Sequence, residues 1–217
     1  MPKLFKQYLL MPFKFLDIFH EFKNKKFNFL DIGCGNHSPS QTKLFFPNCF
    51  YYGFDREKYN ISEGDIALME EFYMGDLDDL TSLDSVPNNF FEVIVVSHVI
   101  EHIKFGEQVL QKLALKLKVG GVMFVEWPSF RSLALPSMRG TLNFSDDKTH
   151  IRLYDLISVA NLLIEAGCRV VKGGRRRYFR RILLMPLVFL KNFHAPAGAF
   201  WDLLGFSDYI LVRKTTK

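Results

Sequence analysis

Residues 27–35 read FNFLDIGCG, and this stretch decides the fold class. Its apolar beginning predicts a short buried strand, and Gly33 and Gly35 predict a tight turn at the carboxyl end of that strand. Ser38 and Pro39 then predict the start of a helix, with Ser38 as its N-cap and Pro39 at its first position. A glycine-rich turn between a strand and a helix is typical of open α/β folds that bind nucleotides at that turn.

The alternation of strands and helices continues along the chain. Apolar runs predict six further strands, at 50–54, 72–74, 91–96, 122–125, 168–171 and 209–212. Helices are predicted over 109–117, where Gly120 and Gly121 stop the helix, and over 154–166, where Gly167 follows. This alternation predicts an α/β fold with a mostly parallel sheet and helices on both faces. The last two strands are expected to pair antiparallel, with an insertion between them.

The length and composition predict one globular domain. The chain has 217 residues, of which 48% are hydrophobic, which is enough for one filled core and too little for two ordinary domains with a linker. We therefore expect a single domain over 1–217. Within it we expect a basic N-terminal extension (1–26), a lid (about 127–149) and the insertion between the last two strands (about 175–205).

Charge and hydropathy bear on partners and location. The net charge is +5, and five of the basic residues cluster at Arg175, Arg176, Arg177, Arg180 and Arg181. The cluster leads into an apolar run at 182–190 that is too short to span a bilayer. It predicts either peripheral association with an anionic membrane, or a core or lid segment beside solvated arginines. No secretory signal is evident at the N-terminus, so we expect a cytoplasmic protein with three reduced thiols, at Cys34, Cys49 and Cys168.

Acidic residues end the predicted strands where a ligand would bind. Asp55 follows Gly35 by 20 residues, and a carboxylate at that place can accept both hydroxyls of an adenosine ribose. Asp76 can accept from the adenine amine, beside the N–H of Leu77. Asp31, just before the first glycine, would repel a pyrophosphate and suits a cation. S-adenosylmethionine, which has an ammonium and a sulfonium but no phosphate, fits this pattern better than a nicotinamide dinucleotide.

With these residues in place, the chain resembles the class I S-adenosylmethionine-dependent methyltransferases, in particular the group typified by the ubiquinone and menaquinone biosynthesis methyltransferases. The matching stretches are FLDIGCGN at 29–36, YYGFD at 51–55, MGDLDD at 74–79, FEVIVVSHVIEHI at 91–103, LKVGGVMFVEWPS at 117–129 and HIRLYDLISVANLLIEAG at 150–167. The resemblance implies a Rossmann-like sheet of seven strands with an antiparallel C-terminal hairpin. It also implies cofactor contacts at Asp31, Gly33, Gly35, Asp55, Asp76, Leu77 and Ser97.

The methyl acceptor is less determined by the sequence. The Asn/Asp-Pro-Pro-aromatic signature of adenine and amide N-methyltransferases is missing after the fourth strand, where Ser97 and His98 stand. We expect O-methylation of a small-molecule or a lipid- or glycan-linked acceptor, with His98 and His150 as candidate catalytic residues. His150 is equally well explained as a cap of the following helix. The alternatives are an RNA methyltransferase that uses the basic patch at 175–181, and a non-catalytic protein that keeps the cofactor fold.

A metal ion is not expected. In some relatives a Glu-x-x-Glu-His run and a later histidine hold a divalent ion. Here the corresponding residues are His98, Glu101, His102 and His150, so histidine replaces the first glutamate. This replacement weakens a site for a hard cation.

Overall fold

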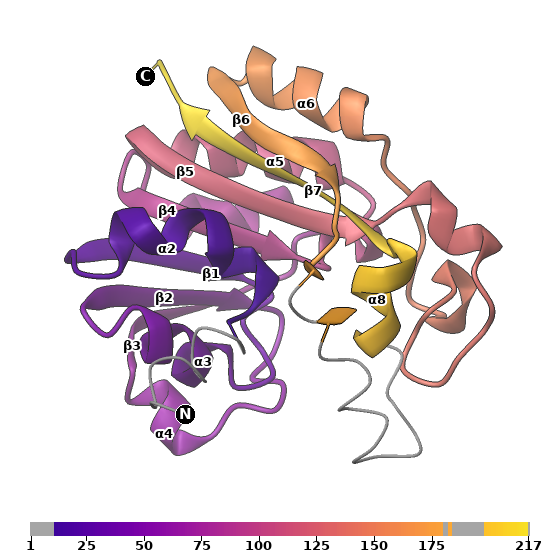
Figure 1. The fold of residues 1–217 in the computed structure, drawn as a ribbon. Helices are drawn as coiled ribbons and strands as arrows, with labels where there is room; N and C mark the ends of the chain where they lie inside the picture. The colour runs from indigo at the N-terminus through magenta and orange to yellow at the C-terminus, as the bar shows by residue number, and fades with distance from the viewer. Residues whose placement is uncertain (1–10, 180–181, 184–197, 217) are drawn as a thin grey trace.

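In the computed structural model, the described residues are 11–179, 182–183 and 198–216. They form a seven-stranded sheet in the order β3-β2-β1-β4-β5-β7-β6 (Figure 1). Its strands are β1 Phe27–Ile32, β2 Cys49–Asp55, β3 Met69–Met74, β4 Phe91–Ser97, β5 Leu117–Pro128, β6 Cys168–Arg175 and β7 Ser207–Lys214. All neighbours pair in parallel except β7, which is antiparallel to both β5 and β6. The predicted mostly parallel sheet with an antiparallel C-terminal pair is confirmed.

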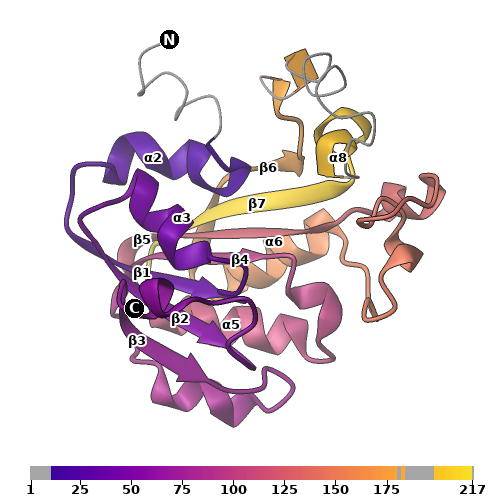
Figure 2. The ribbon, with the colours of Figure 1, turned by 90° about the horizontal axis from the view of Figure 1, so that it is seen from below.

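Helices cover both faces of this sheet. The described α-helices are α2 Leu16–Phe22, α3 Ser38–Phe45, α4 Glu63–Ile66, α5 Gly106–Lys116, α6 Leu156–Glu165 and α8 Gly198–Leu204. Short 3₁₀ helices are η1 Phe13–Phe15, η2 Leu80–Ser85, η3 Ile100–His102, η4 Phe130–Ala134 and η5 Phe144–Asp146. Figure 2 shows α2 and α3 on one side of the sheet and α5 on the other.

The core has two halves because side chains of a strand point alternately to the two faces. In β4, Ile94 and Val96 pack with the helices α5 and α6, whereas Val93 and Val95 pack with α2 and α3. The continuous apolar run of β4 therefore reflects burial on both faces, as expected for a central parallel strand. The three cysteines are all buried and none pairs with another. Among the described residues, no helix has the length and hydropathy needed to cross a bilayer.

Two local predictions are corrected. Ser38 is the first residue of α3 and not its N-cap; His37, with a φ of +56°, precedes the helix, and the Ser38 hydroxyl donates to Asp31 at 2.5 Å. Gly120 and Gly121 do not end a helix either. The helix α5 ends at Lys116 and both glycines lie within β5, where a Cβ on Gly121 would meet backbone oxygens at 2.9–3.1 Å.

The three special segments are placed only in part. The described portion of the N-terminal extension, η1 and α2, packs Phe13, Phe15 and Ile18 onto the sheet. The predicted lid contains η4 and η5. Much of the predicted insertion and of the apolar run at 182–190 lies outside the described residues, as do Arg180 and Arg181. That these segments belong to one domain, and that 127–149 acts as a lid, stay predictions.

Candidate cofactor and acceptor site

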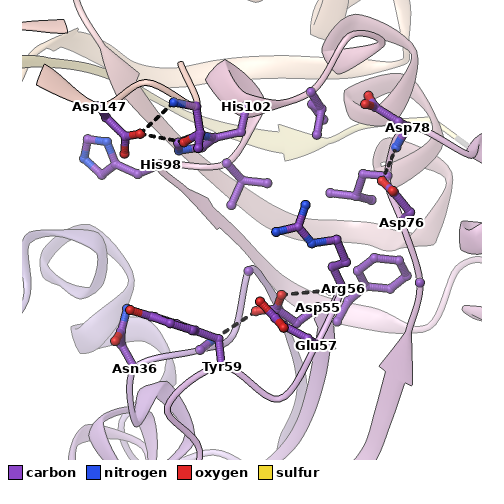
Figure 3. A pocket seen from close by; sticks show the side chains of 18 residues that line it. Asn36, Asp55, Arg56, Glu57, Tyr59, Asp76, Asp78, His98, His102 and Asp147 are labelled. Atoms are coloured by element: carbon purple, nitrogen blue, oxygen red, sulfur yellow. Dashed lines mark hydrogen bonds between the residues drawn. The ribbon is translucent and has the colours of Figure 1, made fainter. Parts of the chain in front are cut away.

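A pocket of about 650 Å³ lies where strands β1, β2, β3 and β4 end (Figure 3). Figure 3 shows three groups of side chains around it. Asp55 ends β2 and is followed by Arg56 and Glu57. Asp76 and Asp78 follow β3, and His98, His102 and Asp147 lie at a third side. The volume is in the range of small-molecule and cofactor sites.

The glycine turn and Asp55 form one unit. Asp55 Oδ2 accepts the N–H of Gly35 at 3.1 Å, and Oδ1 accepts the N–H of Arg56 at 2.7 Å. Burial raises the pKa of Asp55, and these backbone N–H groups oppose the rise. A Cβ on Gly35 would lie 2.9 Å from the carbonyl oxygen of Tyr59, and Gly33 has a φ of +73°. Only glycine fits this turn, which leaves room for a ligand beside Asp55.

The pocket wall is strongly acidic. Asp76 and Leu77 line it as the sequence places them, and Asp78, which sequence reasoning missed, lines it as well. Asp76 Oδ1 accepts the N–H of Asp78 at 2.9 Å, which orders this turn. The charged lining residues are the acidic Asp55, Glu57, Asp76, Asp78 and Asp147 against the basic Arg56 and His98. A wall with this excess of carboxylates fits a cationic adenosine cofactor and repels a diphosphate.

Two predicted cofactor residues are placed differently. Asp31 is fully buried, and its Oδ2 accepts hydrogen bonds from Ser38 at 2.5 Å and Tyr51 at 2.8 Å, with the Lys14 ammonium 3.6 Å away. The Ser97 hydroxyl lies 3.5 Å from Glu126 Oε2. Neither Asp31 nor Ser97 is among the described residues that line the pocket, whereas Gly33, Gly35, Asp55, Asp76 and Leu77 are. Direct contacts of all seven with the cofactor stay predictions.

His98 lines the pocket and is held between two carboxylates. Its Nδ1 lies 3.2 Å from Glu101 Oε1 and its Nε2 lies 3.4 Å from Glu126 Oε1. Burial opposes a charge on the ring, but the hydrogen bonds to both glutamates outweigh it and raise the pKa of His98 to about 9. The ring is therefore protonated near neutral pH with both nitrogens engaged. Glu101 and Glu126 thus hold the ring from both sides, and a catalytic role for His98 stays a prediction.

Unlike His98, His150 is not among the described residues that line the pocket. Its Nδ1 donates to the carbonyl oxygen of Phe144 at 2.7 Å, and its ring stacks on that of Phe144 with centroids 4.7 Å apart. It also packs against His102. His150 is thus a buried support for its neighbours, closer to the structural alternative than to a catalytic base.

His102 also lines the pocket, and its Nδ1 contacts Thr149. The Thr149 hydroxyl donates its one hydrogen to Asp147 Oδ1 at 2.6 Å. His102 Nδ1 lies 2.9 Å from Thr149 Oγ1, so it must donate to that hydroxyl oxygen. Burial opposes ionisation of Asp147, but the hydrogen bonds from Thr149 lower its pKa. His102 Nε2 lies 4.0 Å from Glu101 Oε1. Sequence reasoning missed Asp147 and Thr149, which lie just before the recognised stretch that begins at His150.

Three of the four residues compared with the metal ligands of relatives lie close together. One ligand atom each from Glu101, His102 and His150 lies within 4.8 Å of the others. Glu101 is also bonded to the His98 ring, whose positive charge disfavours a cation nearby. The absence of a metal stays a prediction.

The predicted basic patch at 175–181 does not include Arg176 as an exposed charge. Its guanidinium is buried and pairs with Glu126 at 2.6 Å and with Asp202 of α8 at 2.7 Å. Burial opposes the charge, but the two carboxylates raise the pKa of Arg176 further. Arg176 therefore belongs to an internal ion-pair network that joins β5, α8 and His98, and of the described arginines in the cluster only Arg175 and Arg177 are exposed.

A sheet in this strand order, with an acidic, phosphate-excluding pocket where its first four strands end, defines a class I S-adenosylmethionine-dependent methyltransferase. The chain belongs to the methyltransferase domain family, whose model matches residues 6–172. S-adenosylmethionine is therefore its cofactor, and the predicted family and cofactor are confirmed. The narrower likeness to the ubiquinone and menaquinone enzymes stays a prediction.

Solved structures share the fold at low identity. A SAM-dependent methyltransferase from Archaeoglobus fulgidus is 18% identical with a TM-score of 0.57, over 92% of this chain and 91% of that chain. A putative sarcosine dimethylglycine methyltransferase from Galdieria sulphuraria is 16% identical with a TM-score of 0.62, over 98% and 86%. An O-methyltransferase family protein from Burkholderia thailandensis is 14% identical with a TM-score of 0.61, over 94% and 54%. No curated protein matches the chain.

Proposed function

We propose that the protein transfers the methyl group of S-adenosylmethionine to a hydroxyl oxygen of a small-molecule or a lipid- or glycan-linked acceptor. The observation that carries the proposal is the hydrogen bond between His102 Nδ1 and Thr149 Oγ1 at the pocket, which leaves Nε2 as the ring nitrogen that can accept a proton. A hydroxyl must lose its proton to become a good nucleophile, so an O-methyltransferase benefits from a general base at the acceptor. One solved structure of this fold is named as an O-methyltransferase family protein, which agrees with the proposal.

Each part of the pocket has a separate task in this proposal. Asp55 holds the ribose and keeps the Gly35 turn in place through the same carboxylate. The turn at Asp76 offers an acceptor oxygen and the N–H of Leu77 to the adenine ring. Bound S-adenosylmethionine supplies an electrophilic methyl group on a sulfonium. His102 accepts the acceptor's hydroxyl proton at Nε2. The resulting imidazolium is stabilised because its Nδ1–H donates to Thr149, whose hydroxyl donates to the Asp147 carboxylate.

RNA methylation has less support. The alternative relied on the arginines at 175–181, but Arg176 is neutralised inside the protein by Glu126 and Asp202. The acidic pocket wall also disfavours a polyanionic strand close to the cofactor.

The test has two stages. Calorimetry first compares S-adenosylhomocysteine with NADH, and binding of NADH alone would contradict the cofactor assignment. Transfer of a labelled methyl group is then measured on paired acceptors that differ only in a hydroxyl or an amine. We expect methylation of the hydroxyl compound, and a loss of roughly 10²- to 10⁴-fold in His102→Gln. His20→Gln, an exposed histidine of α2, is the matched control. An unchanged rate in His102→Gln, or methylation of the amine alone, would refute the proposal.

A further inference from the structure

Three segments meet where β7 begins, and each carries exposed apolar side chains. The N–H of Ser129, just before η4, donates to the carbonyl oxygen of Phe206 at 2.7 Å, and the N–H of Arg176 donates to that of Ser207 at 2.8 Å. Arg176 also binds Asp202 of α8. The start of η4, the end of β6 and the helix α8 are therefore neighbours, and Figures 1 and 2 both show α8 beside the segment after β5.

The apolar side chains on these segments are large and open to solvent. Phe130 and Leu133 of η4 are 53% and 50% exposed, Phe179 is 68% exposed and Leu203 of α8 is 42% exposed. Scattered exposed apolar residues are normal, but several on adjoining segments mark an interaction surface. We call these four residues the docking face.

Two exposed arginines stand beside the apolar side chains of the docking face. Arg131 stands between Phe130 and Leu133 and is exposed, and so is Arg177 next to Phe179. The nearby carboxylate of Asp202 is already neutralised by Arg176. Aromatic and leucine side chains among arginines fit the interface of an anionic membrane, where the apolar groups enter the headgroup layer and each arginine adds electrostatic attraction.

The docking face also adjoins the acceptor side of the pocket. His98, on the pocket wall, packs against Trp201 of α8 with ring centroids 4.9 Å apart and against Phe206 with centroids 6.0 Å apart. We infer that η4, α8 and residues 177–179 bind peripherally to an anionic membrane and bring the pocket to an acceptor linked to a lipid. This inference rests on the proposed function and narrows its acceptor class.

The experiment is co-sedimentation of the full chain with vesicles of equal parts phosphatidylglycerol and phosphatidylcholine, compared with vesicles of phosphatidylcholine alone. We expect binding to the anionic vesicles at low salt, less at high salt, and none to the neutral ones. Arg131→Gln with Arg177→Gln should weaken the partition roughly 25-fold, from about five-fold for each arginine. Phe130→Ser with Leu133→Ser should weaken it at least tenfold.

The control is Ile157→Ser with Ile164→Ser, which removes exposed apolar side chains from α6 and should leave binding unchanged. Wild-type protein that stays in the supernatant at low salt would overturn the inference. Equal binding by all variants would also overturn the inference. So would a wild-type dimer in sedimentation velocity that the variant Phe130→Ser with Leu133→Ser does not form. Calorimetry with S-adenosylhomocysteine on the same samples tests the cofactor site separately, so failure of the membrane inference and failure of the proposed function are distinguishable.

Discussion

Replacement of Asp55 by alanine tests the cofactor site most directly. The Asp55 carboxylate has about four lone-pair positions, and the backbone N–H groups of Gly35, Arg56 and Glu57 occupy three of them. One remains for a ribose hydroxyl. A hydrogen bond to a charged group contributes about 1.5–3 kcal/mol, and part of the loss in the variant is offset by water that enters the space. We therefore expect Asp55→Ala to weaken binding of S-adenosylhomocysteine by about 1.5–3 kcal/mol, or roughly 10- to 150-fold in Kd.

The assay is isothermal titration calorimetry at neutral pH, with thermal melting of each variant to confirm folding. Asp84→Ala is the matched control, since Asp84 is exposed and pairs with Lys112 away from the pocket. Asp55→Asn should fall between wild type and Asp55→Ala, because the amide keeps one acceptor oxygen. A folded Asp55→Ala protein that binds within twofold of wild type would refute the reasoning that the ribose lies at this carboxylate.

Three further predictions concern stability and metal binding. Burial opposes ionisation of Asp65, but hydrogen bonds from serine and histidine neighbours hold its pKa well below the usual range. The contribution of Asp65 to stability is thus complete above about pH 4 and is lost as pH falls below it. In urea unfolding, Asp65→Asn should be less stable than wild type by about 1–3 kcal/mol at pH 7, and this difference should shrink in acid. Arg176→Met should cost about 3–5 kcal/mol because it leaves two buried carboxylates unpaired, while Arg177→Met should change the unfolding free energy by less than about 0.5 kcal/mol. Elemental analysis of purified protein should find no stoichiometric metal, because the His98 charge beside Glu101 repels a cation; one zinc, manganese or magnesium per chain would contradict this expectation.

Strand and helix order, and the main cofactor-binding pattern, could be predicted because they depend on short-range regularities. Apolar runs, glycine turns and the 20-residue spacing between Gly35 and Asp55 each encode a local backbone shape. In the structure the Asp55 carboxylate does bind the Gly35 N–H. The end of the helix α5 could not be predicted, because glycines such as Gly120 and Gly121 occur both at helix ends and where two strands approach closely.

The sequence by itself therefore determined the fold class, the cofactor and the residues of the glycine turn. Only the tertiary structure decided the partners of each histidine. Glu101 and Glu126 stabilise the protonated ring of His98, while Thr149, bonded to Asp147, accepts from His102 Nδ1. Arg176 is buried against carboxylates that come from β5 and α8. The charge state of a side chain depends on the groups within a few ångströms of it. Those groups come from segments far apart in the chain, so no local pattern specifies them.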